Sequence, residues 1–258
     1  MLRILARRIL RFYKTQTIIF VFLALITFGA VLLDMPIASK DNQSIGFLNA
    51  LFTATSATCV TGLVVVDTYN HWTLFGQIVI LMLIQTGGLG FMTMATLFSL
   101  ALKRTISLSE RLLISETLNY DNISGIVRLV KHIIIGSFLI ESVGAALLSI
   151  RFIPEFGVKS GIYKSIFHSV SAFCNAGFDL MGEKSDFIGL VDYVADPIVV
   201  FTITTLIIIG GIGFFVWENL INKEKVKKCR LHTKIAVLIT AILRSEERRV
   251  GKECRSRW

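Results

Sequence analysis

Two short segments of the chain share a pattern of small, hydroxyl-bearing and thiol-bearing side chains that ends in a glycine. The first is LFTATSATCVTGL at residues 51–63, and the second is IFHSVSAFCNAGF at residues 166–178. Phe, Ser, Ala, Cys and Gly coincide at a constant spacing of 115 residues. A second pair follows downstream, with GGLGF at residues 87–91 and GGIGF at residues 210–214. Repetition of two motifs in the same order indicates a duplicated unit.

Coordination of a cation by backbone carbonyl oxygens is the chemistry that these segments could perform. The stretches 45–58 and 162–173 are too short and too polar to cross a bilayer, but each could dip into it and return. Non-helical backbone at membrane depth is tolerated where it is buried in protein or lines a watery cavity. Gly62 and Gly177 can adopt backbone angles denied to other residues, so that successive carbonyls point the same way. A ring of such carbonyls can replace the water shell of a monovalent cation.

An ordinary turn in an external loop is the alternative explanation for each glycine. One motif alone would not decide between the two, but two copies in the same topological position favour pore loops. In each copy a short helix would direct the negative end of its dipole toward the cation.

Other site classes fit these residues poorly. Four cysteines are present, and neither a CxxC nor a Cys/His ligand spacing occurs among them, which argues against a metal site. They give no disulfide framework, because Cys59 and Cys174 occupy equivalent motif positions and Cys229 lies in a basic cytoplasmic segment. The Gly-Gly-x-Gly segments lie within apolar stretches and do not continue to Lys-Ser/Thr, so they are not nucleotide loops. Small residues there let helices pack closely or bend.

The composition places the chain in a lipid bilayer. Hydrophobic residues make up 53% of it, charged residues 17%, and the mean hydropathy is +0.68. Apolar stretches typical of membrane spans cover residues 17–33, 72–102, 126–150 and 197–217. Asp-Met-Pro after the first stretch is not a signal-peptide cleavage site, so a retained span is expected.

The net charge of +9 reflects basic clusters at alternate ends of these spans and does not indicate a nucleic-acid partner. Basic residues precede the first span, fill the connection between the second and third, and follow the fourth, whereas Lys40 is the only one between the first and second. By the positive-inside rule, the amino terminus is cytoplasmic and both motifs face outside. We expect a multi-pass protein of the plasma membrane, in contact with lipid.

The order of elements resembles the membrane subunit of the Trk/Ktr/HKT superfamily of potassium transporters. Each unit has a span, a pore helix, the sequence Val-Thr-Gly-Leu or Asn-Ala-Gly-Phe, and a second span. SATCVTGLVVVDT at residues 56–68 is especially similar to the Ktr type. The resemblance extends from residue 1 to about residue 243. It implies an all-α integral membrane fold in which four span/pore-loop/span units surround one pore with pseudo-fourfold symmetry.

The same resemblance implies roles for particular residues and partners. Potassium would be the transported ion, with sodium as a candidate coupling ion and no other cofactor. The complete protein would be a homodimer that binds a cytoplasmic nucleotide-binding regulatory subunit. The filter carbonyls would come from Val60, Thr61, Gly62, Asn175, Ala176 and Gly177, with Cys59 and Cys174 at the filter base.

The chain departs from this family in holding two complete units and the start of a third, and we therefore expect an amino-terminal half. Residues 244–258 resemble the translation of a sequencing adapter, because AGATCGGAAGAGCGT encodes Arg-Ser-Glu-Glu-Arg, and we expect this tail to be non-native. A charged cytoplasmic tail is the alternative. The expected parts are a cytoplasmic amino terminus (1–16), the first unit (17–102), an amphipathic cytoplasmic connection (103–125), the second unit (126–221), a basic linker (222–234), the start of the third unit (235–243) and the tail (244–258).

Four polar residues outside the filter segments are also candidates for function. Glu141 falls inside the third span, where an acid is a candidate for an intramembrane polar site, although it could also be protonated or paired with Ser or Lys. His168 and Asp179 flank the second filter segment. Asp179 and Asp67 could concentrate cations outside the pore, but we expect solvated loop acids.

Monovalent cation uptake without covalent chemistry is the function that these observations favour. A first rival is a two-unit channel subunit that dimerises. A second is a membrane enzyme that uses Glu141 with His132 or His168, which the expected topology disfavours because the two histidines lie near opposite faces. A third is a non-conducting receptor or scaffold, which leaves the doubled segments unexplained.

Overall fold

The computed structural model describes residues 2–90, 93, 126–183 and 185–212. Helices form all of the regular secondary structure in these ranges except an isolated antiparallel bridge between Ser39 and Trp72. The all-α expectation is therefore confirmed for the described residues. The expected connection (103–125), basic linker (222–234), third-unit start (235–243) and tail (244–258) lie outside them.

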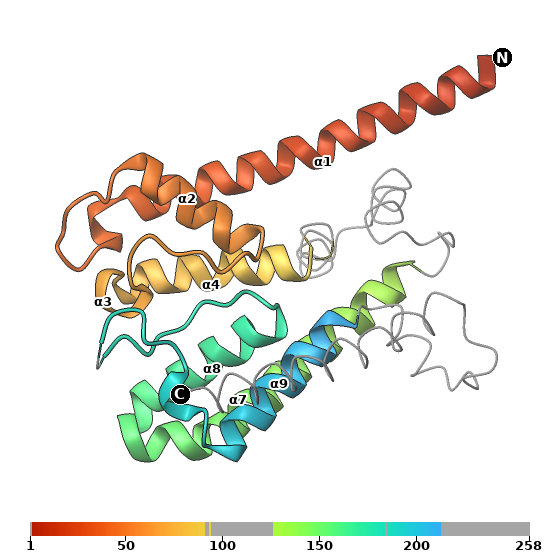
Figure 1. Cartoon of the computed structure of the whole chain (residues 1–258). Helices are drawn as coiled ribbons and strands as arrows, with labels where there is room; N and C mark the ends of the chain where they lie inside the picture. Colours follow the sequence, from red (N-terminus) through yellow and green to blue (C-terminus); the bar gives the residue numbers. More distant parts are fainter. Residues whose placement is uncertain (1, 91–92, 94–125, 184, 213–258) are drawn as a thin grey trace, which may run out of the picture.

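Within residues 2–90, the first described part of the chain, three helices have substantial length. Helix α1 (Leu2–Asp34) is followed by the 3-10 turn η1 (Pro36–Ala38), α2 (Phe47–Thr58), the short α3 (Thr68–His71) and α4 (Leu74–Gly88). Thr73 caps α4 by accepting a hydrogen bond from the Gly76 amide. Both α2 and α4 pack against α1 (Figure 1).

The second part has the same order of a long helix, a shorter helix and an apolar helix. Helix α7 (Ile126–Phe156) is followed by α8 (Val158–Phe173), the 3-10 turn η3 (Val191–Tyr193) and α9 (Pro197–Gly211). The side chain of Asp196 caps α9, and Pro197 occupies its first turn, where a missing amide proton costs no helical hydrogen bond. Helices α7, α8 and α9 pack against one another.

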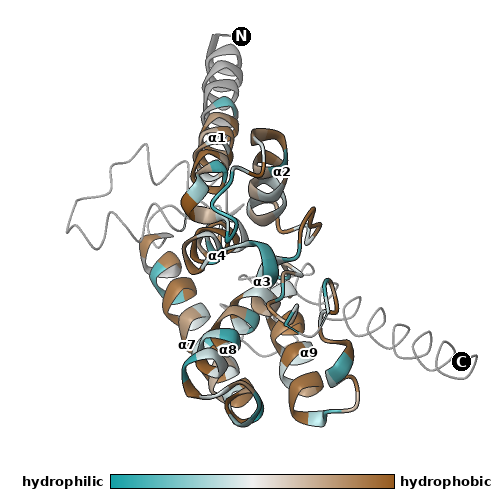
Figure 2. Ribbon diagram, turned by 90° about the vertical axis from the view of Figure 1, so that its left-hand side faces the viewer, coloured by the Kyte–Doolittle hydropathy of each residue, from teal (hydrophilic) through white to brown (hydrophobic). Residues whose placement is uncertain are grey.

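One buried core joins the two parts. It includes Trp72, Ile80 and Ile84 from the first part and Phe167 from the second, each at most 1% exposed. Helix α4 contacts α8 across this boundary. Outside the core, large apolar side chains are exposed along the long helices, as expected for a surface in contact with lipid; examples are Phe20, Phe28, Leu139 and Phe201. Figure 2 shows hydrophobic helices and a hydrophilic α3 between the two parts.

The expected spans and the observed helices differ in length. In the described ranges, Val130–Phe156 is the single helical segment that is long and apolar enough to cross a membrane. Ile19–Asp34, Leu74–Gly88 and Pro197–Gly211 are shorter apolar helices. Helix α4 ends inside the apolar stretch 72–102, because Leu89 is its C-cap and Gly90 takes a left-handed conformation with φ of 80°.

Candidate functional site

The first filter segment follows the carboxyl end of α2. Cys59 caps the helix, Val60 has φ of 58° and Gly62 has φ of 76°. The Thr61 amide donates a hydrogen bond to the Ser56 carbonyl of α2 at 3.0 Å, which holds the turn against the end of this helix. A β-branched residue with positive φ is uncommon and costs about 1–3 kcal/mol, so its surroundings must hold Val60 in place.

The second filter segment repeats this geometry after α8. Cys174 caps the helix, Asn175 has φ of 59° and Gly177 has φ of 73°. The Ala176 amide binds the Ser171 carbonyl at 2.8 Å, as Thr61 binds Ser56. The two motifs therefore fold into the same backbone turn. The sequence pointed to the glycines and gave no signal for the left-handed Val60.

The two filter segments contact each other at their glycines. A Cβ atom added to Gly62 would lie 2.7 Å from the Ala176 carbonyl oxygen and 3.2 Å from the Gly177 Cα atom. A Cβ atom added to Gly177 would lie 3.3 Å from the Gly62 Cα atom. Glycine is required at both positions by its left-handed conformation, and at Gly62 also by the close approach.

Glycines of the apolar helices α4 and α9 pack closely behind the two expected filter segments. A Cβ atom on Gly87 of α4 would overlap the Thr58 carbonyl oxygen, and one on Gly210 of α9 would overlap that of Phe173. Thr58 and Phe173 are the last residues of α2 and α8. A Cβ atom on Gly88 would lie 2.5 Å from the Cys174 Sγ atom. Close packing, which the sequence predicted for these glycine segments, is confirmed.

The two cysteines expected at the filter base have different surroundings. Cys59 is exposed and Cys174 is buried, and both are free thiols. The Cys174 Sγ atom lies 3.8 Å from Gln85 Oε1, so the thiol donates a weak hydrogen bond to α4. Equivalent positions in the sequence therefore do not guarantee equivalent burial.

Glu141 is buried and joins α7 to α4. Gln85 Nε2 donates to both of its carboxylate oxygens, at 3.0 and 3.2 Å, and Glu141 is 5% exposed. Ser169 of α8 donates to the Glu141 backbone carbonyl at 2.7 Å. The sequence suggested Ser or Lys as the partner of the carboxylate, whereas among the described residues its side-chain partner is the Gln85 amide.

Replacing Glu141 by leucine is expected to lower stability by about 1–3 kcal/mol, since it leaves the buried Gln85 amide without its acceptor. The double variant Glu141→Leu/Gln85→Leu should recover much of that loss, because neither polar group is then left alone. Thermal unfolding of the purified proteins in detergent measures both changes. Equal losses in the single and double variants would show that this hydrogen bond contributes little.

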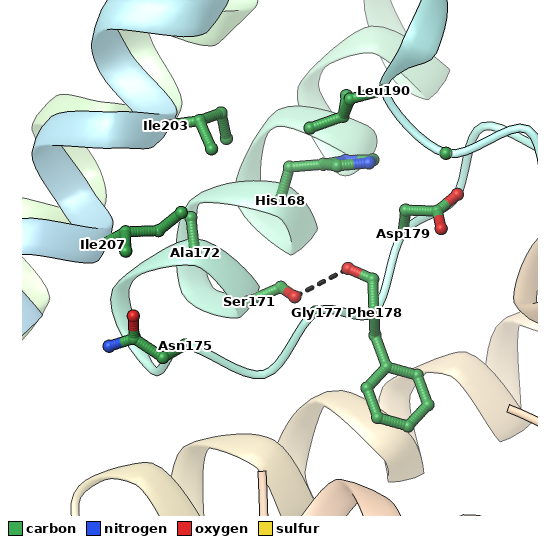
Figure 3. A pocket seen from close by; sticks show the side chains of 11 residues that line it. His168, Ser171, Ala172, Asn175, Gly177, Phe178, Asp179, Leu190, Ile203 and Ile207 are labelled. Carbon is green, nitrogen blue, oxygen red and sulfur yellow. Dashed lines mark hydrogen bonds between the residues drawn. The ribbon is translucent and has the colours of Figure 1, made fainter. Parts of the chain in front are cut away.

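His168 and Ser171 bind the chain that leaves the second filter segment. His168 Nδ1 lies 2.7 Å from the Lys164 carbonyl and its Nε2 accepts from the Leu180 amide at 3.3 Å, an arrangement that a neutral ring protonated on Nδ1 satisfies. Ser171 donates to the Phe178 carbonyl at 2.6 Å. These residues border a cavity of about 320 Å³ together with Asn175, Ile203 and Ile207 (Figure 3).

Lys164 of α8 is buried, with 1% of its surface exposed. Its ammonium lies 2.6 Å from a Glu183 carboxylate oxygen and 3.5 Å from the centre of the Phe156 ring. It also lies 4.7 Å from the Tyr69 ring of α3, and burial and the Glu183 charge raise the pKa of that phenol. In the sequence, Lys164 is a single lysine in a stretch of moderate hydrophobicity, and this does not predict that its side chain is buried.

The acidic residues beyond the filter behave differently from each other. Asp179 is half-buried and accepts from the Met181 amide at 3.0 Å. Asp67 is 7% exposed, so its expected description as a solvated loop acid was wrong.

His168 and Glu141 belong to separate hydrogen-bond networks, which removes the basis for an enzyme centre that pairs them.

The described residues form helices with an apolar surface and two matched glycine turns at helix ends, and these features are typical of a helical membrane protein. The chain belongs to the TrkH family, described as cation transport proteins, whose model matches residues 11–244. The resemblance to this superfamily is thereby confirmed. Because the family is one of transport proteins, the expectation that the chain is not an enzyme is confirmed as well.

Three relatives illustrate the relationship. The chain is 44% identical over 233 residues to "Potassium/sodium uptake protein NtpJ" of Enterococcus hirae, covering 90% of the chain and 51% of the relative. It is 46% identical to "Ktr system potassium uptake protein B" of Bacillus subtilis, with the same coverage. It is 39% identical to the protein of that name from Vibrio alginolyticus, covering 89% of the chain and 50% of the relative. The chain thus spans about half the length of these relatives.

Proposed function

We propose that the chain is the amino-terminal half of a potassium uptake protein and supplies two of four segments of a selectivity filter. The pair of identical backbone turns, in which Gly62 and Gly177 meet, is the observation that carries this proposal. The ion would be coordinated by backbone carbonyls of both segments, namely those of Val60, Thr61, Gly62, Asn175, Ala176 and Gly177. Cys59 and Cys174 would form the base of the filter.

The two parts α1–α4 and α7–α9 would be two span/pore-loop/span units around a pseudo-fourfold axis. The protein would lie in the plasma membrane with a cytoplasmic amino terminus, as the basic clusters indicate. The relatives' names support potassium and sodium as ions that are taken up. We assign potassium as the transported ion and sodium as the coupling ion. The name "Ktr system" supports a multi-subunit assembly, in which we place a homodimer and a nucleotide-binding cytoplasmic subunit.

Ion uptake by the complete gene product tests this proposal. Cells that lack their own potassium uptake should grow at low potassium when they express it, and they should accumulate the potassium tracer rubidium in competition with potassium. Expression of residues 1–243 alone should give no uptake if four segments are required. Uptake by the short chain would instead favour the dimeric two-unit channel, and no uptake by the complete product would overturn the proposal.

A further inference from the structure

A buried carboxylate joins the chain that leaves the first filter segment to the chain that leaves the second. Asp67 accepts a hydrogen bond from the Asn70 amide at 2.8 Å with one oxygen, which caps α3. Its other oxygen accepts from the Phe187 amide at 2.9 Å, 120 residues further along the chain. The Asp67 carboxylate thus has one partner on each side of the boundary between the two parts of the fold.

Asn70 adds a second connection across the same boundary. Its side-chain amide donates to the Gly182 carbonyl at 2.6 Å and also binds the Asp186 carboxylate. Phe187 holds a left-handed backbone with φ of 58°, a conformation that a non-glycine residue adopts at a cost of about 1–3 kcal/mol. Its amide binds Asp67 in this conformation. Backbone strain at Phe187 is thus associated with the contact to Asp67.

Gly182 leaves room for the Asp67 carboxylate. A Cβ atom at this position would overlap the carboxylate oxygens and would lie 2.5 Å from Cγ. Asp67 follows Gly62 by five residues, and Gly182 follows Gly177 by five. The two chains that leave the filter are therefore in contact at both ends, Gly62 with Gly177 and Asp67 with Gly182. Figure 2 shows α3, which Asp67 caps, between the two parts of the fold.

We propose that Asp67 is a positioning residue that fixes the spacing of the two filter segments and thereby the discrimination between potassium and sodium. The inference rests on the proposed function. A carbonyl filter selects between monovalent cations through its size or through the number and field of its oxygens, and both depend on how the segments are placed. Hydrogen bonds to an ionised acceptor are stronger than neutral ones, which suits Asp67 to this role. Asp67 itself does not contact the ion.

Uptake of rubidium and sodium by variants of the complete protein, normalised to the amount in the membrane, tests the proposal. Asp67→Ala and Asp67→Asn should reduce the rubidium-to-sodium uptake ratio by about tenfold, because Asn can accept from only one of the two amides. Asp41→Asn is the matched control, since Asp41 is an exposed acid on the same outer connection, and its ratio should be unchanged. An unchanged ratio in both Asp67 variants would overturn the proposal.

A double-variant cycle separates positioning from general damage. Gly182→Ala should lower the ratio as Asp67→Ala does, because the new methyl group displaces the carboxylate. The double variant Asp67→Ala/Gly182→Ala should be no worse than either single variant if the two act at one junction. Additive losses would overturn the proposal. If the Asp67 variants do not reach the membrane, Asn70→Ala takes their place and should lower the rubidium-to-sodium uptake ratio in the same assay. A normal ratio in Asn70→Ala would then overturn the proposal.

The wild-type protein distinguishes failure of this inference from failure of the proposed function. If wild type takes up neither ion, the proposed function fails. If wild type transports and the Asp67 and Asn70 variants keep its ratio, the inference alone fails.

Discussion

Replacing Gly62 by aspartate is expected to abolish potassium uptake by the complete protein, to below about 1% of wild type. The new Cβ atom would lie 2.7 Å from the Ala176 carbonyl oxygen, in a backbone conformation with φ of 76° that L side chains rarely adopt. In the proposed filter, a carboxylate would then stand between the two segments and either bind the cation too tightly or displace the carbonyls proposed to coordinate it. Rubidium uptake, normalised to protein in the membrane, measures the effect.

Gly46→Asp is the matched control for this experiment. Gly46 also has positive φ, 90°, but a Cβ atom there would meet no other atom within 4 Å. This variant carries the same chemical change and a similar backbone strain at the start of α2, away from the filter. It should retain most of the uptake. Normal uptake by Gly62→Asp would exclude this segment from the ion pathway.

Gly87→Ala is expected to lower the stability of the protein by roughly 3 kcal/mol and to reduce uptake with it. The added methyl group would overlap the Thr58 carbonyl oxygen, and because the obstacle is backbone, either α4 or the end of α2 must shift. Overpacking of this kind usually costs about 1–3 kcal/mol, and more where the backbone cannot yield. Size-exclusion chromatography after heating measures how much monodisperse protein remains and thereby the change in stability.

Thr86→Ala serves as the control for Gly87→Ala. Thr86 is the neighbouring residue of α4, and its hydroxyl binds the Met82 carbonyl within the same helix. Its truncation should leave thermal stability and uptake close to wild type. If Gly87→Ala were equally harmless, the close contact between α4 and the end of α2 would not matter for the proposed filter.

Local pattern in the sequence predicted the helical elements well. Apolar stretches and basic flanks located α1, α4, α7 and α9, and the repeated motif located the turns after α2 and α8. The glycine segments were expected to allow close packing, and Gly87 and Gly210 do so. These features depend on residue type at short spacing, which a single sequence displays directly.

Features that depend on contacts between distant residues could not be predicted in this way. Asp67 looked like a loop acid, and only its contact with Phe187 and Gly182 explains its burial. Val60 carries no local signal for positive φ, because the turn is imposed by the Thr61 to Ser56 hydrogen bond and by packing. The partner of Glu141 likewise lies 56 residues away on another helix, at Gln85.

The hydrogen bond between Gln85 and Glu141 has a consequence for the biogenesis of the protein. Synthesis proceeds from the amino terminus, so α4 leaves the ribosome before the residue that accepts from its buried amide has been made. Until α7 enters the membrane beside it, Gln85 must find a temporary acceptor, such as water, headgroups or its own helix backbone. The contacts of α4 are therefore completed only when α7 arrives, and we expect the two parts of the fold to become stable together.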